Sequence, residues 1–284
     1  MLDHREGRLR FLRRTTDRQA RQPRRRFRRG VYLLPSLFTI GNMFCGYACV
    51  VYAMRGEYET AAPFIGFAIV LDILDGRIAR MTGTDSEFGV QFDSMADVIS
   101  FGVAPAILSF SWGLSPLGRL GWAAGFMFVT AAAMRLARFN IQSATGGDKR
   151  YFVGMPSPAA AGIPAATVYA YPWGFYDYRE ALPVLAMVLV PAALMVSTIR
   201  FRSFKTIDLQ SRRPYTVLIL IAAGIVLITT HPRFVLVAMA YSYLASGFIG
   251  LAITRFKHRG GRGAAADAQQ PATSQPPARD SAAG

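Results

Sequence analysis

The sequence predicts an all-α fold, a polytopic bundle of transmembrane helices, and three observations support it. Hydrophobic residues make up 52% of the 284 residues, and the mean hydropathy is +0.26. Apolar stretches of roughly 20 residues, enough to cross a hydrocarbon core of ~30 Å, recur along the chain. Basic residues gather between these stretches instead of being spread evenly. Together these features exclude an ordinary soluble domain.

Eight stretches have the length and composition of a membrane span. The seventh is short, and the second and third contain acidic residues, so the same pattern also fits a six-helix core with about two additional helices. The stretches, in order, are 33–54, 61–81, 87–112, 118–138, 156–172, 181–199, 215–230 and 234–254.

The net charge of +15 follows the expected topology. With eight spans, the Arg-rich first 30 residues and the later basic clusters all lie on one side of the membrane, whereas the opposite loops carry little positive charge. By the positive-inside rule, both termini are expected in the cytoplasm. The basic clusters suit a lipid bilayer with anionic headgroups, so a nucleic-acid partner is not expected.

Three regions are expected from this organisation. Residues 1–32 form a basic cytoplasmic N-terminal tail, and 33–256 form the transmembrane domain. Residues 257–284, rich in Ala, Pro, Gln and Gly, form a disordered cytoplasmic C-terminal tail. A cleavable signal peptide is not expected, because the first apolar stretch is too long.

The two cysteines, Cys45 and Cys49, lie four residues apart on the first predicted span. This spacing on one helix does not suit a disulfide, and no further thiols exist to complete a zinc site. The three histidines are widely separated. The sequence therefore predicts packing roles for the cysteines and a mechanism that does not depend on histidine.

The pattern most informative about chemistry is D-x2-D-G-x2-A-R-x8-G-x3-D-x3-D, which lies within the second and third spans. The two acids of each pair are three or four residues apart, so each pair shares one helix face. If the two faces meet, they form one cluster of four carboxylates. The specified positions are Asp72, Asp75, Gly76, Ala79, Arg80, Gly89, Asp93 and Asp97.

Unpaired acids at membrane depth cost several kcal/mol each, so such a cluster requires a cation, a partner or water. Carboxylate oxygens are hard ligands suited to Mg²⁺ or Mn²⁺, and four of them can hold two ions that clamp a pyrophosphate. Gly76 and Ala79 leave room for close approach of a ligand or a neighbouring helix. The pattern predicts a two-metal site for phosphate-transfer chemistry.

At every specified position the pattern resembles the signature of the CDP-alcohol phosphatidyltransferase family. The resemblance implies a reaction in which an alcohol displaces CMP from a CDP-linked substrate, and a site at the cytoplasmic mouth of a six-helix core. It implies that Asp72, Asp75, Asp93 and Asp97 are metal ligands and that Asp97 is also the catalytic base. It further implies that the CDP moiety is bordered by Gly76, Ala79 and Arg80.

Four further blocks, 34–47, 135–140, 153–164 and 195–205, resemble stretches of the bacterial membrane-integral phosphatidylserine synthases. This likeness implies CDP-diacylglycerol and L-serine as substrates, although Ser36 and Met155 depart from the residues common in those relatives. A serine carboxylate needs a cationic donor. Candidate contacts to the acceptor or a phosphate are Arg135, Arg138 and Asn140. Thr39 and Asn42 on the first span could face the acids.

Two alternatives stay open at this point. The acceptor could be glycerol 3-phosphate, an inositol phosphate or choline, although a phosphorylated acceptor would want a denser basic pocket. An ion-coupled transporter would also use intramembrane acids, but it would not require Gly76, Ala79 and Gly89 at their places. The sequence leaves a homodimer open.

Overall fold

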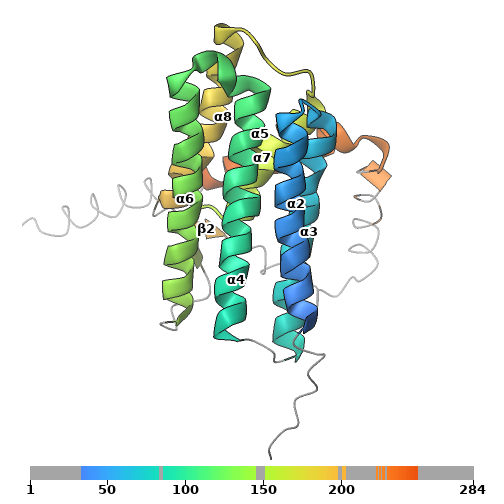
Figure 1. Cartoon of the computed structure of the whole chain (residues 1–284), viewed down its shortest axis with the longest axis vertical. Helices are drawn as coiled ribbons and strands as arrows, with labels where there is room; N and C mark the ends of the chain where they lie inside the picture. Colours follow the sequence, from blue (N-terminus) through green and yellow to red (C-terminus); the bar gives the residue numbers. More distant parts are fainter. Residues whose placement is uncertain are drawn as a thin grey trace, which may run out of the picture.

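The computed structural model describes residues 33–82, 86–144, 151–197, 200–202 and 222–248, the last range without 223, 225 and 228. The chain forms a bundle of long helices (Figure 1), so the predicted all-α fold is confirmed. The helical elements are α2 (Leu33–Met54), α3 (Tyr58–Thr82), α4 (Glu87–Asp97), η1 (Val98–Val103), α5 (Ala104–Ser109), η2 (Phe110–Leu114), η3 (Ser115–Leu117), α6 (Arg119–Ala144), α7 (Ser157–Ala170) and α8 (Tyr178–Val196).

Two short strands and further helical residues, among them described positions between 222 and 230, follow in the chain. The strands β1 (Tyr151–Val153) and β2 (Arg200–Arg202) pair antiparallel, with Phe152 opposite Phe201. A further helix covers residues 232–248. The two expected tails, 1–32 and 257–284, lie outside the described residues, as does most of the predicted span 215–230.

Four helical segments of the described chain are long and apolar enough to cross a membrane, which identifies an integral membrane protein. They are Ser36–Met54, Glu87–Leu117, Arg119–Gln142 and Tyr178–Val196. Helix α3 has 25 residues, a spanning length, but carries acids and arginines toward its C-terminal end. Helix α7 has only 14 residues and contains Pro164. Helices α3 and α7 therefore do not meet the criteria of length and hydropathy, although they correspond to the predicted spans 61–81 and 156–172. The charged residues of α3 lower its hydropathy, and α7 is too short.

The segment from α4 to η3 is continuous but not uniformly α-helical. Two stretches, η1 and η2, have the wider π-helical winding on either side of the short α5. Pro105 lies in the first turn of α5 and has no backbone N–H to donate to the preceding turn. Local widening of this kind is frequent beside functional sites, and η1 begins directly after Asp97.

Small side chains let the helices approach closely around a few large ones. The largest fully buried side chains include Ile65, Phe101, Trp112 and Phe128. Many of the other core positions are alanines from α3, α6 and α7, a composition typical of helix contacts in membranes. Cys45 and Cys49 are buried, unbonded members of the same core, as predicted.

The two ends of the bundle differ in their contacts. At one end, the Trp112 indole donates to the carbonyl of Tyr171 at 2.8 Å, and the Tyr58 hydroxyl donates to the carbonyl of Ser111 at 2.6 Å. At the other end, lower in Figure 1, α3 ends and α4 begins. The acids therefore lie on the two helices that meet at this second end.

Candidate active site

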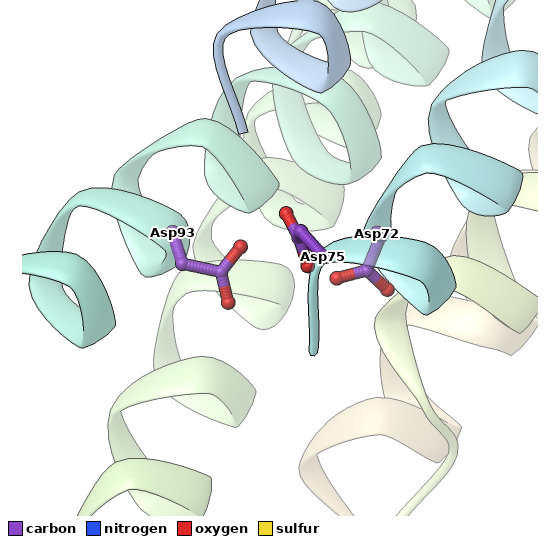
Figure 2. A group of neighbouring side chains, drawn as sticks. All are labelled: Asp72, Asp75 and Asp93. Atoms are coloured by element: carbon purple, nitrogen blue, oxygen red, sulfur yellow. The ribbon is translucent and has the colours of Figure 1, made fainter. Parts of the chain in front are cut away.

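Helices α3 and α4 bring three of the predicted acids together. One carboxylate oxygen from each of Asp72, Asp75 and Asp93 can be chosen so that all three lie within 4.8 Å of one another. Figure 2 shows Asp93 extending from one helix toward Asp72 and Asp75 on the other. Asp75 is buried, and the other two are half-buried. The prediction that the two acidic faces turn toward each other is confirmed for these three residues.

The start of α4 is set by local hydrogen bonding. Ser86 has extended backbone angles, and its hydroxyl accepts from the N–H of Gly89 at 3.0 Å, which satisfies one free donor of the first turn. Glu87 in the same turn complements the helix dipole. This cap fixes where the helix that carries Asp93 and Asp97 begins.

The chemistry of this donor set fits a divalent cation. The three carboxylates are crowded together. The one salt bridge found within the described part of the chain joins Arg233 to Glu59 and involves none of them. Oδ1 of Asp93 is buried and accepts no hydrogen bond. Buried anionic oxygens without partners are costly. Hard oxygen ligands of this kind are those that Mg²⁺, Mn²⁺ and Ca²⁺ prefer.

Asp97 lies one turn beyond Asp93 and has different surroundings. It is buried, and its Oδ1 accepts a hydrogen bond from Nδ2 of Asn42 at 3.0 Å. It is not one of the three acids grouped within 4.8 Å, although it interacts electrostatically with all of them. The structure thus distinguishes Asp97 from the other acids, because it lies outside their close group and accepts its hydrogen bond from an amide.

Helix α2 supplies a hydrogen bond to each acidic helix, as expected for Thr39 and Asn42. The Thr39 hydroxyl donates to Oδ2 of Asp75 at 3.2 Å, and the Asn42 amide donates to Oδ1 of Asp97. Asn42 is fully buried, and its Oδ1 accepts no hydrogen bond. The placement of two acids therefore depends on a helix that contributes no acid itself.

A close helix contact holds Asn42 in place. The Ser100 hydroxyl donates to the Asn42 carbonyl at 2.9 Å, which joins α2 to the π-helical η1. One turn along α2, a Cβ on Gly46 would lie 2.6 Å from Oγ of Ser100, a distance too short for any side chain. Ser100 and Gly46 could not be predicted from the sequence, because the small size of each residue is their only signal.

The residues expected to border the CDP moiety lie on the last turns of α3. A Cβ added at Gly76 would meet nothing within 4 Å, so the helix surface beside Asp75 is open. Ala79 is half-buried one turn later. The side chain of Arg80 lies outside the described ones. The room beside Gly76 agrees with its expected role, and the contacts to CDP stay predictions.

The three acceptor candidates on α6 have separate partners. Arg135 donates to Oγ of the buried Ser157 at 3.4 Å and interacts electrostatically with Asp97 and Asp72. Arg138 instead reaches the end of α8, where it donates to the carbonyls of residues 196 and 197 at 3.4 and 3.3 Å. Of the two arginines, the structure therefore places Arg135 near the acids and gives Arg138 a helix-capping contact.

Asn140 has a third environment. Its Nδ2 donates to Oγ of Ser94 at 2.8 Å, which ties α6 to α4 immediately beside Asp93. Ser94 was not identified from the sequence, because a single serine next to a motif acid carries no distinctive pattern. The bond makes Asn140 a support for the acidic helix.

Comparison with known proteins bears on what this arrangement does. Residues 32–199 match the family model described as CDP-alcohol phosphatidyltransferase. A CDP-diacylglycerol–serine O-phosphatidyltransferase of Helicobacter pylori is 36% identical over 220 residues, which are 77% of this chain and 91% of that protein. One of Mycobacterium leprae is 38% identical over 144 residues, 49% of this chain and 48% of the relative. An archaetidylserine synthase of Methanothermobacter thermautotrophicus is 36% identical over 170 residues, 59% of this chain and 69% of the relative.

Proposed function

Because this chain belongs to the CDP-alcohol phosphatidyltransferase family, we propose that it transfers the phosphatidyl group of CDP-diacylglycerol to L-serine. The products are phosphatidylserine and CMP. The observation that carries the reaction class is the convergence of the motif acids of α3 and α4 within 4.8 Å. The choice of serine is supported by relatives named as serine phosphatidyltransferases, one of which matches most of this chain.

Members of this family generally depend on a divalent metal, and the acidic cluster is suited to one. We propose a two-metal site for Mg²⁺ or Mn²⁺, held by Asp72, Asp75, Asp93 and Asp97. The bound ions would supply positive charge that neutralises the pyrophosphate and the departing CMP. The grouping of three carboxylates and the unbonded Oδ1 of Asp93 support this assignment.

Asp97 is proposed as the general base. The serine hydroxyl attacks the phosphorus that carries the diacylglycerol, a new P–O bond forms, and the bond to CMP breaks. The hydroxyl proton passes to Asp97. Asn42 occupies Oδ1 of Asp97, which orients the carboxylate and leaves Oδ2 for the proton. A base within hydrogen-bond reach contributes about 10²–10⁴-fold in rate.

Substrate contacts divide between two helices. Gly76, Ala79 and Arg80 on α3 are proposed to border the CDP moiety, with the open surface at Gly76 in support. For the serine carboxylate we propose Arg135, because its guanidinium lies in the electrostatic surroundings of Asp97 and Asp72. Arg138 and Asn140 are proposed to hold α8 and α4 in position, in keeping with their hydrogen bonds.

The proposed location is the inner membrane of a bacterial cell, with both termini and the active site facing the cytoplasm. The clustering of basic residues on one side of the predicted spans supports this orientation. We propose 33–256 as the catalytic domain between two cytoplasmic tails, in a bilayer with anionic headgroups. A homodimer is the proposed assembly to be tested by the mass of the purified protein.

The test is release of CMP from CDP-diacylglycerol by the purified full-length chain. L-serine should support release, and glycerol 3-phosphate, inositol phosphate and choline should not. Asp93→Asn provides the inactive control, because it removes a proposed metal ligand and keeps the side-chain shape. Release of CMP with another acceptor but not with serine would overturn the substrate assignment, and no release with any alcohol would overturn the reaction.

A further inference from the structure

Aromatic residues gather at the end of the bundle opposite the acids, where α6 begins and the connection from α7 to α8 runs (Figure 1, upper end). All three tryptophans of the chain belong to this end: Trp112 in η2, Trp122 near the start of α6, and Trp173 in the connection. Trp112 is buried, whereas Trp122 and Trp173 are 69% and 70% exposed. Tyr176 and Tyr178 are exposed as well. We call Trp122, Trp173, Tyr176 and Tyr178 the aromatic collar.

The collar lies where three apolar spans begin or end. The span Glu87–Leu117 ends there, and the spans Arg119–Gln142 and Tyr178–Val196 begin there. Along their length these spans carry exposed apolar side chains, which face lipid in an integral membrane protein. Tryptophan and tyrosine combine an apolar ring with a polar N–H or O–H, so they suit the boundary between hydrocarbon and water. The collar therefore continues the lipid-facing surface at its edge.

The connection from α7 to α8 is fastened to η2 through Trp112. The Trp112 indole donates to the carbonyl of Tyr171 at 2.8 Å, and the N–H of Phe175 donates to the carbonyl of Trp112 at 2.8 Å. The rings of Trp112 and Phe175 also pack edge to face, with centres 4.8 Å apart. Gly174 has a φ of +69°, which permits the tight turn between these contacts. The connection that carries Trp173 is therefore fixed to the end of the segment from α4 to η3.

The same continuous segment carries Asp93 at its other end. Trp112 follows Asp93 by 19 residues. At the α-helical rise of ~1.5 Å per residue, they are at most about 28 Å apart along the helix axis, close to the ~30 Å thickness of the hydrocarbon core. With the collar at one boundary of the hydrocarbon, the acids therefore lie near the other. The pyrophosphate of a CDP-linked lipid lies at that level, because its acyl chains stay in the hydrocarbon.

We propose that the aromatic collar anchors the protein in the lipid headgroup interface on the side opposite the acids, and that through Trp112 this anchor holds the acids at the depth of a lipid-bound pyrophosphate in the other leaflet. The partner is the lipid–water interface, whose carbonyl and phosphate oxygens accept hydrogen bonds from indole and phenol groups. The second part rests on the proposed function, because it assumes a CDP-linked lipid as substrate. The collar does not touch the reacting atoms.

The first experiment measures the depth of the exposed tryptophans in the purified full-length protein in phospholipid bilayers. Trp122→Phe, Trp173→Phe and the double variant are compared with the wild type in lipids brominated near the carbonyl end or near the methyl end of the acyl chain. The double variant keeps only the buried Trp112 and should be quenched weakly by both lipids. The fluorescence contributed by Trp122 and Trp173 should be quenched about twofold or more better by the shallow bromines than by the deep ones. Stronger quenching by the deep bromines would overturn the anchor. So would no quenching by either lipid, the result for tryptophans that face water or a second protein copy.

The second experiment tests the link between the collar and the acids. The collar variant combines Trp122→Leu with Trp173→Leu, which removes the polar N–H groups. The matched control combines Phe44→Leu with Phe67→Leu, which are 63% and 60% exposed near the middle of α2 and α3. In bilayers the collar variant should raise the KM for CDP-diacylglycerol about three- to fivefold with little change in kcat, because the acids no longer keep their depth. In detergent micelles, which adapt to the protein, its KM should stay within twofold of the wild type. An unchanged KM in bilayers, an equal rise in the control, or an equal rise in micelles would each overturn the link.

These outcomes are distinct from failure of the proposed function. Quenching requires no catalysis, so it decides the anchor even if CDP-diacylglycerol releases no CMP. If the wild type used another CDP-linked lipid, the same comparison of KM values for that lipid would decide the link. Wild-type activity only with a water-soluble CDP-alcohol would overturn the link, and quenching alone would then decide the anchor.

Discussion

Replacement of Asn42 tests whether the first helix controls the proposed base. Asn42→Leu keeps the approximate volume of the side chain but removes the amide that donates to Oδ1 of Asp97 at 3.0 Å. The bond from Ser100 survives, because it goes to the backbone carbonyl of residue 42. The substitution therefore removes one contact to the acid and leaves the α2–η1 contact in place.

The expected magnitude follows from burial. Asn42 is fully buried and Asp97 nearly so, which leaves little access for water to replace the lost donor. A hydrogen bond to a charged group is worth about 1.5–3 kcal/mol. If this free energy serves to orient the base in the transition state, kcat should fall about 10- to 100-fold. The KM for CDP-diacylglycerol should change little.

The assay is serine-dependent CMP release, with thermal unfolding measured on the same preparation. Ser109→Ala is a matched control for the loss of a buried hydrogen bond, since the Ser109 hydroxyl donates to the carbonyl of Pro105 at 2.7 Å in the same segment and has no link to the acids. It should leave kcat near that of the wild type. A folded Asn42→Leu protein with kcat within twofold of the wild type would refute the proposed role of Asn42.

Three further predictions concern the site and the topology. Chelation by EDTA should abolish CMP release and added Mg²⁺ or Mn²⁺ should restore it, whereas full release in EDTA would exclude the metal site. Asp97→Asn should lower kcat by about 10²–10⁴-fold and retain CDP-diacylglycerol binding. Asp93→Asn should also weaken nucleotide binding. A near-normal kcat in Asp97→Asn would show that Asp97 is not the base. A cysteine introduced at 174–177, in the connection between α7 and α8, should react with an impermeant reagent only from outside the cytoplasmic membrane. Background labelling should be low, because both native cysteines are buried. Labelling from the cytoplasmic side alone would reverse the topology.

Much of the fold and of the acid cluster could be predicted because strong local patterns encode them. Apolar length marks the first six spans, and each of them falls on a described helical segment. The spacing of Asp72, Asp75 and Asp93 fixed their faces, which the structure brings together. Thr39 and Asn42 were predictable as polar residues, three apart, within a largely apolar helix.

The contacts that support the acids were harder to predict, because they depend on tertiary packing. Ser100 is one small polar residue among many, and its importance appears only when Gly46 comes against it. The π-helical turns around Pro105 rotate the later residues relative to an ideal helix, which no periodicity of the sequence shows.

The cations of α6 show why the membrane side of a charge does not determine its role. Arg135 and Arg138 are one turn apart and share the expected cytoplasmic end, and Asn140 lies ~140° around the helix from Arg135. Because arginine side chains are long, two arginines on one face of a helix can contact different neighbouring helices. Arg138 meets the exposed carbonyls at the end of α8, where a cation is favourable. Arg135 instead donates to the buried Ser157 of α7 and interacts electrostatically with Asp97 and Asp72. These neighbours, rather than its place in the sequence block, make it the proposed partner of the acceptor.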